Sequence, residues 1–178
     1  MTQATQISAL QTALQTIHDP EQFFSQVIPI VGDLLNCDRC FLYLRNPETG
    51  MSKVTHCWRR SDRYPNIFDP DWKPEPKGLA QDDPLFAAAL RVAPSVFVDD
   101  VETADPQVVN RAFEQANFGH RALIHAHLRS EGKLWGILQP CVFDQPHIWS
   151  DFDRSIISEL ESALTPKAIV YVQSTNPI

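Results

Sequence analysis

Apolar residues near the start of the chain recur every three or four positions, which is the spacing of one face of a helix. This first stripe consists of Ile7, Leu10, Leu14 and Ile17. Asp19 and Pro20 then predict the start of a second helix, because Asp is a favoured capping residue and Pro fits the first helical position. The second helix carries a broad apolar face between residues 23 and 35, and Pro29 inside it predicts a kink.

Two later regions are rich in aromatic and β-branched residues and predict hairpins. The first pairs Arg39 to Arg45 with Met51 to Arg60 across a turn that contains Pro and Gly. The second pairs His120 to Arg129 with Leu134 to Phe143. A short strand, Ser95 to Asp99, is predicted between them. Because each hairpin must bury an apolar face, we expect both to join one antiparallel sheet.

Three further helices are predicted over Asp83 to Arg91, over Pro106 to Asn117 and after the start signal at Ser150. In the first of them Asp83 is the predicted cap and Pro84 takes the first helical position. Beyond Pro166, residues 167–174 fit either a restarted helix or a terminal strand, and the sequence leaves both open. Residues 61–84 contain five prolines and predict a long structured loop of the kind that is often functional.

The order of these elements predicts an α+β fold, with a central antiparallel sheet of five or six strands and helices on both faces. A length of 178 residues suits one domain over 1–178, with an N-terminal helix at 1–18 and a C-terminal extension at 165–178. In the second hairpin one set of alternating positions is plainly apolar and the other is mixed. A mixed sheet face under the 61–84 loop indicates a pocket there.

Composition and charge indicate which partners and which cellular compartment to expect for this protein. Apolar residues make up 43% of the chain and charged residues 21%, as in soluble globular proteins. The net charge of -7 argues against nucleic acid, which requires an excess of Lys and Arg. No apolar run approaches the roughly 18 residues that cross a bilayer, and no signal-peptide pattern begins the chain. Four cysteines are too few for a disulfide scaffold, so we expect a cytoplasmic protein with reduced thiols.

Motifs for catalysis are absent from the sequence, which lacks Gly-x-Ser-x-Gly, a Gly-rich phosphate loop and His-Glu-x-x-His, so we do not expect an enzyme. Cys37 and Cys40 form a Cys-x-x-Cys between a predicted helix and strand, where a structural role is favoured over redox or zinc chemistry. His125 and His127 share a strand face. This arrangement fits two ligands of a metal ion or one ligand of haem. It fits equally well two histidines on a sheet face that helices cover. No metal site is assigned.

Several segments resemble the bilin-binding GAF domains of phytochromes and cyanobacterial photoreceptors. The most similar segments are Gly-His-Arg-Ala-Leu-Ile at 119–124 and Gly-Lys-Leu-Trp-Gly-Ile-Leu at 132–138. Residues 82–86 and 145–152 also resemble segments of these domains. The likeness extends from about Asp19 to Ser174. It implies a GAF-like fold, a sensory role and a cyanobacterial source.

The same resemblance bears on the cofactor. The family's chromophore-anchoring Cys-His pair falls at Asn110 and Arg111, and the second photoreceptor cysteine falls at Leu85. A thioether needs a thiol, so the resemblance implies no covalently attached bilin. No cofactor is therefore assigned, while non-covalent binding of bilin or haem stays open.

The main functional hypothesis is a non-catalytic regulatory domain that binds a small molecule under the 61–84 loop and signals through protein contacts. The expected ligand-binding residues are Trp72, Phe86, Asn110, Arg111, His120, His125 and His127. A second hypothesis is a degenerate photoreceptor-like scaffold whose pocket is filled by its own side chains. Trp72 would be a lid over the ligand under the first hypothesis and a plug in the pocket under the second. A third is a non-covalent tetrapyrrole sensor or a redox or metal sensor. Apolar stripes at 6–17 and 151–164 predict a homodimer through the terminal helices.

Overall fold

Six antiparallel strands form one sheet across residues 2–177, which are the residues that this computed structural model describes. The strands lie in the order β3-β2-β1-β6-β5-β4. Their bounds are β1 (Arg39–Arg45), β2 (Met51–Arg59), β3 (Lys73–Pro74), β4 (Val96–Val98), β5 (Ala122–Ser130) and β6 (Lys133–Val142). Both predicted hairpins are confirmed, and β1 joins them by pairing with β6, with Leu42 opposite Leu138.

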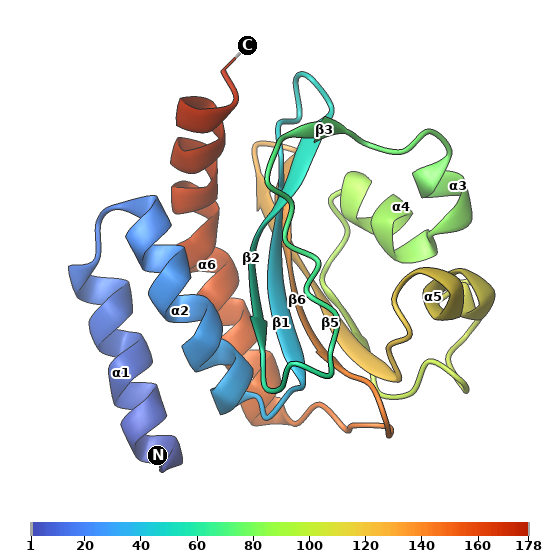
Figure 1. Ribbon diagram of the computed structural model, residues 1–178, viewed down its shortest axis with the longest axis horizontal. Coiled ribbons are helices and arrows are strands. Elements are labelled where there is room, and N and C mark those ends of the chain that lie inside the picture. The colour runs from blue at the N-terminus through green and yellow to red at the C-terminus, as the bar shows by residue number, and fades with distance from the viewer. Residues whose placement is uncertain (1, 178) are drawn as a thin grey trace.

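Helices cover both faces of this sheet, which confirms the predicted α+β architecture (Figure 1). The first layer contains α1 (Gln3–Thr16), α2 (Pro20–Leu34) and α6 (Asp151–Thr175). The second layer contains α3 (Leu79–Asp82), α4 (Pro84–Leu90) and α5 (Arg111–Asn117), together with the loop that follows β2. None of the helices within 2–177 combines the length and apolar character of a membrane span.

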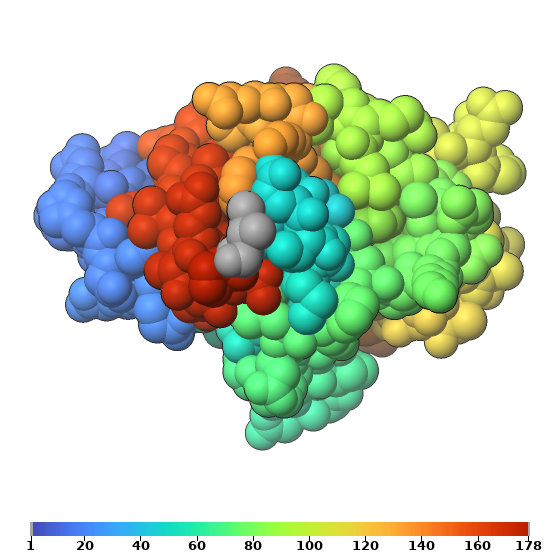
Figure 2. All heavy atoms as spheres, turned by 90° about the horizontal axis from the view of Figure 1, so that it is seen from above, coloured from blue at the N-terminus to red at the C-terminus, as the bar shows by residue number. Residues whose placement is uncertain are grey.

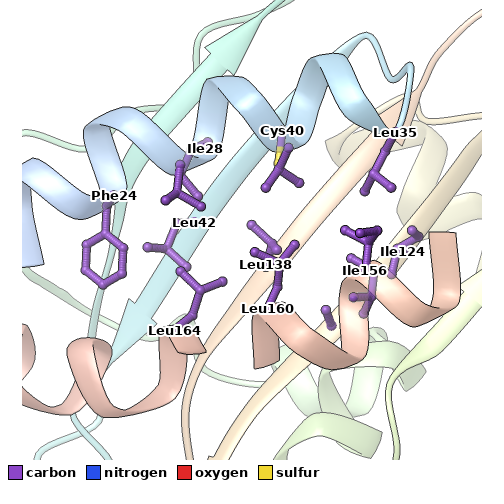
Figure 3. Packing of buried hydrophobic residues seen from close by; sticks show 14 of the residues in the cluster. Phe24, Ile28, Leu35, Cys40, Leu42, Ile124, Leu138, Ile156, Leu160 and Leu164 are labelled. Carbon is purple, nitrogen blue, oxygen red and sulfur yellow. The ribbon is translucent and has the colours of Figure 1, made fainter. Parts of the chain in front are cut away.

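The main core lies between the sheet and the first helical layer. Figure 3 shows α2 and α6 side by side over β1 and β6, with their apolar side chains pointing toward one another and toward the strands. Phe24 of α2, Leu42 of β1 and Leu160 of α6 are all completely buried there. Alternate residues of β5, including Ile124 and Ala126, face the same core, as their period-two pattern predicts.

The apolar stripes of α1 and α6 are used inside the chain. Leu10 and Ala13 of α1 are buried in the main core, and α1 packs against α2. Ile156 and Leu164 of α6 are buried in the same core against the sheet. These stripes therefore do not supply the exposed apolar surface on which the homodimer prediction relied.

The end of the chain resolves the choice left open for residues 167–174, because α6 continues as one helix past Pro166 to Thr175. Ala168 and Val172 extend the buried face of α6 at helical spacing, so packing outweighs the β-propensity of this segment. The side chain of Asn46, in the β1–β2 turn, donates to the carbonyl of Asn176 at 2.8 Å. In Figure 2 the end of α6, in red, accordingly lies beside this turn, in cyan.

Two predicted segments differ from the structure. The helix expected over 106–117 begins only at Arg111, because the Asn110 side chain accepts from the Phe113 N–H at 3.2 Å and caps it there. The 61–84 loop contains two short elements, β3 and α3. A two-residue strand and a single helical turn are too short to show a periodic pattern, so the sequence does not reveal them.

Candidate functional site

A cavity of about 310 Å³ lies between the second sheet face and the layer formed by α3, α4 and α5. Aromatic side chains supply much of its wall, namely Phe41, Tyr43, Phe86, Phe113 and Phe118. The loop after β2 contributes Ile67, Asp69 and Lys73. A larger hollow of about 730 Å³ between α1 and α2 is open to solvent and lined mostly by Ala, Ser and Thr side chains. The aromatic cavity, which is also less open to solvent, is therefore the better candidate binding site.

His125 of β5 lies in the wall of this cavity and hydrogen-bonds to its neighbour His127, with Nδ1 of His125 2.8 Å from Nε2 of His127. Nδ1 of His127 lies 2.7 Å from the carbonyl oxygen of Ala93. The two facing ring nitrogens are thus occupied by one hydrogen bond and cannot hold a metal ion between them. Within residues 2–177, no cluster of three or more His, Cys, Asp or Glu side chains has the arrangement of a metal site.

A buried ionic network lies behind the wall at α5. Glu114 lines the cavity and pairs with the ring of His120, and both side chains are almost completely buried. Arg39 is 1% exposed, with Nη2 2.6 Å from Nε2 of His120 and Nη1 donating to the Pro65 carbonyl at 2.9 Å. Its guanidinium also lies 4.9 Å from the centre of the Phe143 ring. The guanidinium of Arg39, the imidazole of His120 and the carboxylate of Glu114 therefore connect β1, the residues just before β5, and α5.

The proton on His120 follows from this geometry. Burial lowers the pKa of His120, whereas Cys141 and Glu114 raise it, to about 9. A guanidinium has only donors, so its contact with Nε2 is favourable only if that nitrogen keeps its lone pair. The Arg39 guanidinium at Nε2 opposes the second proton, so we assign a ring that is neutral at pH 7 in spite of the raised pKa, with its one proton on Nδ1 facing Glu114.

Asp83 is the second acidic group of the cavity wall. Its side chain caps α4 by accepting from the Leu85 N–H at 3.0 Å. Burial, with a smaller contribution from the negative charge of Glu114, raises the pKa of Asp83 from 3.8 to about 6. The folded protein therefore binds a proton at Asp83 more tightly than the unfolded chain does, and the charged form opposes folding above pH 6.

Asp83→Asn is expected to stabilise the protein at pH 7 by about 1–3 kcal/mol, because Asn still caps the helix and carries no buried charge. The advantage should disappear as the pH falls through 6 toward 4, where the wild-type carboxyl becomes protonated. Urea denaturation of both proteins between pH 4 and 8 measures this difference. Asp105→Asn is the matched control, since the exposed Asp105 side chain accepts from the Gln107 N–H and should show no such trend. An equal difference at every pH would contradict the assignment.

The residues proposed from the sequence fall into three groups. Phe86 and His125 line the cavity. His120 and His127 are buried behind the wall, in contact with Glu114 and His125 respectively. The other three lie away from the wall, as the next paragraph describes.

Asn110 caps α5 and donates to the Asp82 carbonyl at 2.9 Å, and Arg111 is exposed at the start of that helix. Trp72 is half-buried and packs against the main core on the opposite side of the sheet. It immediately precedes β3 at the sheet edge, from which its side chain reaches the helix-side core. Trp72 therefore neither covers nor fills this cavity.

Sequence reasoning missed several members of the site. Glu114 and Asp83 supply its buried carboxylates, and Gln139 of β6 supplies a buried amide. Two signals were present in the sequence. Asp83 was recognised as a helix cap but not as a wall residue, and Phe113, Asn117 and Phe118 lie at the spacing of one helix face.

None of the four cysteines lines the cavity, and all four thiols are free. Cys37, Cys40 and Cys141 are fully buried, and burial together with Cys37 raises the pKa of Cys40 well above its usual range. A protonated, inaccessible thiol is a poor nucleophile and metal ligand. The Cys-x-x-Cys segment is therefore structural.

Comparisons with known proteins agree on the fold. The GAF domain family model matches residues 19–161. No curated protein matches the sequence. The GAF domain of an Acinetobacter phosphoenolpyruvate-protein phosphotransferase has a TM-score of 0.69 at 12% identity, over all of both chains.

Two photoreceptor structures are also similar. A bacteriophytochrome from R. palustris gives a TM-score of 0.71 at 18% identity, over 96% of this chain and 37% of that one. The phycoerythrobilin-bound GAF domain of a cyanobacterial phytochrome gives 0.69 at 16% identity, over 96% and 98%. At these identities the likeness concerns the fold.

Proposed function

The chain belongs to the GAF domain family, a family of sensory ligand-binding domains, and we propose that it is a non-catalytic regulatory domain that binds a small molecule in the cavity beneath residues 61–84. The observation that carries this proposal is a partly open aromatic cavity whose wall includes buried polar side chains, above all His125, Glu114 and Gln139. Ligand sites typically combine a mostly apolar wall with a few well-placed polar groups.

The size of the cavity favours a metabolite over a tetrapyrrole. About 310 Å³ lies at the small end of the roughly 300–1,000 Å³ of ligand pockets. A small metabolite fits such a volume, whereas a four-ring pigment would have to extend beyond it through the open side of the cavity. The open volume also favours ligand binding over the alternative of a scaffold with a self-filled pocket.

A hydrogen-bonded connection supports the proposed signalling role. His127, which contacts the wall residue His125, donates its backbone N–H to the Ser95 hydroxyl at 2.8 Å. Ser95 in turn donates to Glu161 of α6. A ligand that contacts His125 is thus linked through these hydrogen bonds to α6. A protein partner that binds α6 can sense a change in its position. Such coupling requires that ligand binding favours one arrangement of this connection over another.

Thermal unfolding of the full chain with a library of metabolites tests the proposal. We expect at least one compound to raise Tm, because a ligand at 100 times its Kd stabilises the folded state by about 2.7 kcal/mol. Val54→Phe, which adds bulk to the cavity wall, should abolish the shift. Val170→Ala, on an exposed position of α6, should leave it unchanged.

Two outcomes would contradict the proposal. One is a library in which no compound shifts Tm. The other is a visible absorption band on protein purified after co-expression with bilin or haem synthesis, since this would replace the metabolite by a tetrapyrrole.

A further inference from the structure

The hydrogen bonds behind the cavity wall determine where the proton of each histidine lies. A carbonyl oxygen only accepts, so Nδ1 of His127 must donate to Ala93. Burial lowers the pKa of both His125 and His127, consistent with neutral rings. Nε2 of a neutral His127 then keeps its lone pair and accepts from Nδ1 of His125. By elimination, Nε2 of His125 carries no proton.

We propose that the unprotonated Nε2 of His125 is a fixed hydrogen-bond acceptor of the cavity, and that the cavity selects a small, flat heterocycle that donates an N–H to it. This inference rests on the proposed function and adds the chemical class of the ligand. Three features support it. His125 lines the cavity, its Nδ1 is held by His127, and no side chain or backbone donor within residues 2–177 hydrogen-bonds to its Nε2.

The other polar groups of the cavity also favour a donor-bearing ligand. Glu114 and Asp83 present carboxylates from α5 and from the start of α4, and Asp82 and Asp69 add two more acids at the rim. Two lysines, Lys73 of β3 and Lys77, also lie at the rim, where the charges of Lys73 and Asp69 offset each other in an ion pair. An anionic ligand would therefore meet more negative than positive charge, whereas a neutral or cationic N–H donor would not.

The shape of the wall specifies the rest of the ligand. Phe41, Phe86 and Phe113 present aromatic rings to the cavity, and aromatic rings stack favourably on other flat rings. A planar heterocycle would bury its faces against these side chains while its N–H reaches His125.

The tautomer can be tested without any ligand. Long-range ¹H–¹⁵N spectra of the labelled full chain should show His125 protonated at Nδ1 and unprotonated at Nε2. His127→Gln should preserve this pattern, because a Gln amide can donate to the Ala93 carbonyl and accept from His125. His127→Leu should abolish it, since the acceptor for Nδ1 is lost. A wild-type spectrum with the proton on Nε2 of His125 would overturn the inference.

Ligand selection is tested with two probes of equal size, indole and benzofuran, which differ in an N–H replaced by oxygen. We expect indole to bind the wild type about 2- to 10-fold more tightly, the usual range for one hydrogen bond. In His125→Phe the ratio should fall to about one, while in His127→Gln it should persist. The wild-type ratio and the wild-type spectrum decide the matter even if His125→Phe fails to fold.

The outcomes separate this inference from the proposed function. Equal affinity of the two probes for the wild type overturns the inference and leaves the proposed ligand site intact. If neither probe binds and no metabolite shifts Tm, both proposals fail, whatever the tautomer of His125.

Discussion

Arg39→Met is expected to lower the free energy of unfolding by about 2–5 kcal/mol, because two buried hydrogen bonds of the guanidinium are lost and each partner left unsatisfied costs about 1–3 kcal/mol. Met has a similar length and fills much of the space of the arginine. It leaves the Glu114 carboxylate buried without a nearby cation and removes the donor to Nε2 of His120. The Pro65 carbonyl loses a donor as well. Urea denaturation at pH 7 measures the change.

The matched control is Arg63→Met. Arg63 pairs with Asp144 on the surface, where such pairs contribute roughly 0–1 kcal/mol. Adding Glu114→Gln to Arg39→Met should recover part of the loss, because the second substitution removes the unpaired charge. A loss below 1 kcal/mol in Arg39→Met, or no recovery in the double variant, would show that these residues do not act as an ionic network.

Leu160→Ala should destabilise the protein by about 2–5 kcal/mol through the cavity that it creates. Leu160 is completely buried at the centre of the helix-side core, between α6 and the strands (Figure 3). Val170→Ala, on the same helix but 54% exposed, provides the comparison and should change stability by no more than about 0.5 kcal/mol. Chemical denaturation of the two variants side by side gives the difference.

Similar small losses in both variants would mean that α6 does not pack as described. That result would also weaken the proposed connection from the cavity to Glu161, since Glu161 directly follows Leu160 on this helix.

Local signals predicted the starts of three helices correctly, although not the start of α5. The caps at Asp19, Asp83 and Ser150 are confirmed, because each depends on a side chain that bonds within three residues of itself. The hairpins are confirmed for a similar reason, since the alternation of β5 and the turns at their ends are short-range features. The segment after Pro166 stayed open because packing against the core, which is long-range, decides its conformation.

The binding site was less accessible to sequence reasoning. His125 and Phe86 were found because they stand on elements whose buried face could be inferred. The network of Arg39 and His120 was not, since 81 residues separate its two members and no local pattern connects them. The sequence also does not indicate which ring nitrogen of His125 carries the proton. The sequence left a metal or haem ligand and a covered sheet face as alternatives for these two histidines, whereas the carbonyl of Ala93, on another segment, turns them into a directed pair of hydrogen bonds.

The two outermost strands of the sheet have a consequence for behaviour in concentrated solution. β3 has two residues, one of which is Pro74, and β4 has three. Both therefore leave few free backbone groups in line, and a proline nitrogen has no proton to offer a neighbouring chain. Extension of the sheet by pairing of a neighbouring chain with β3 or β4 is therefore disfavoured.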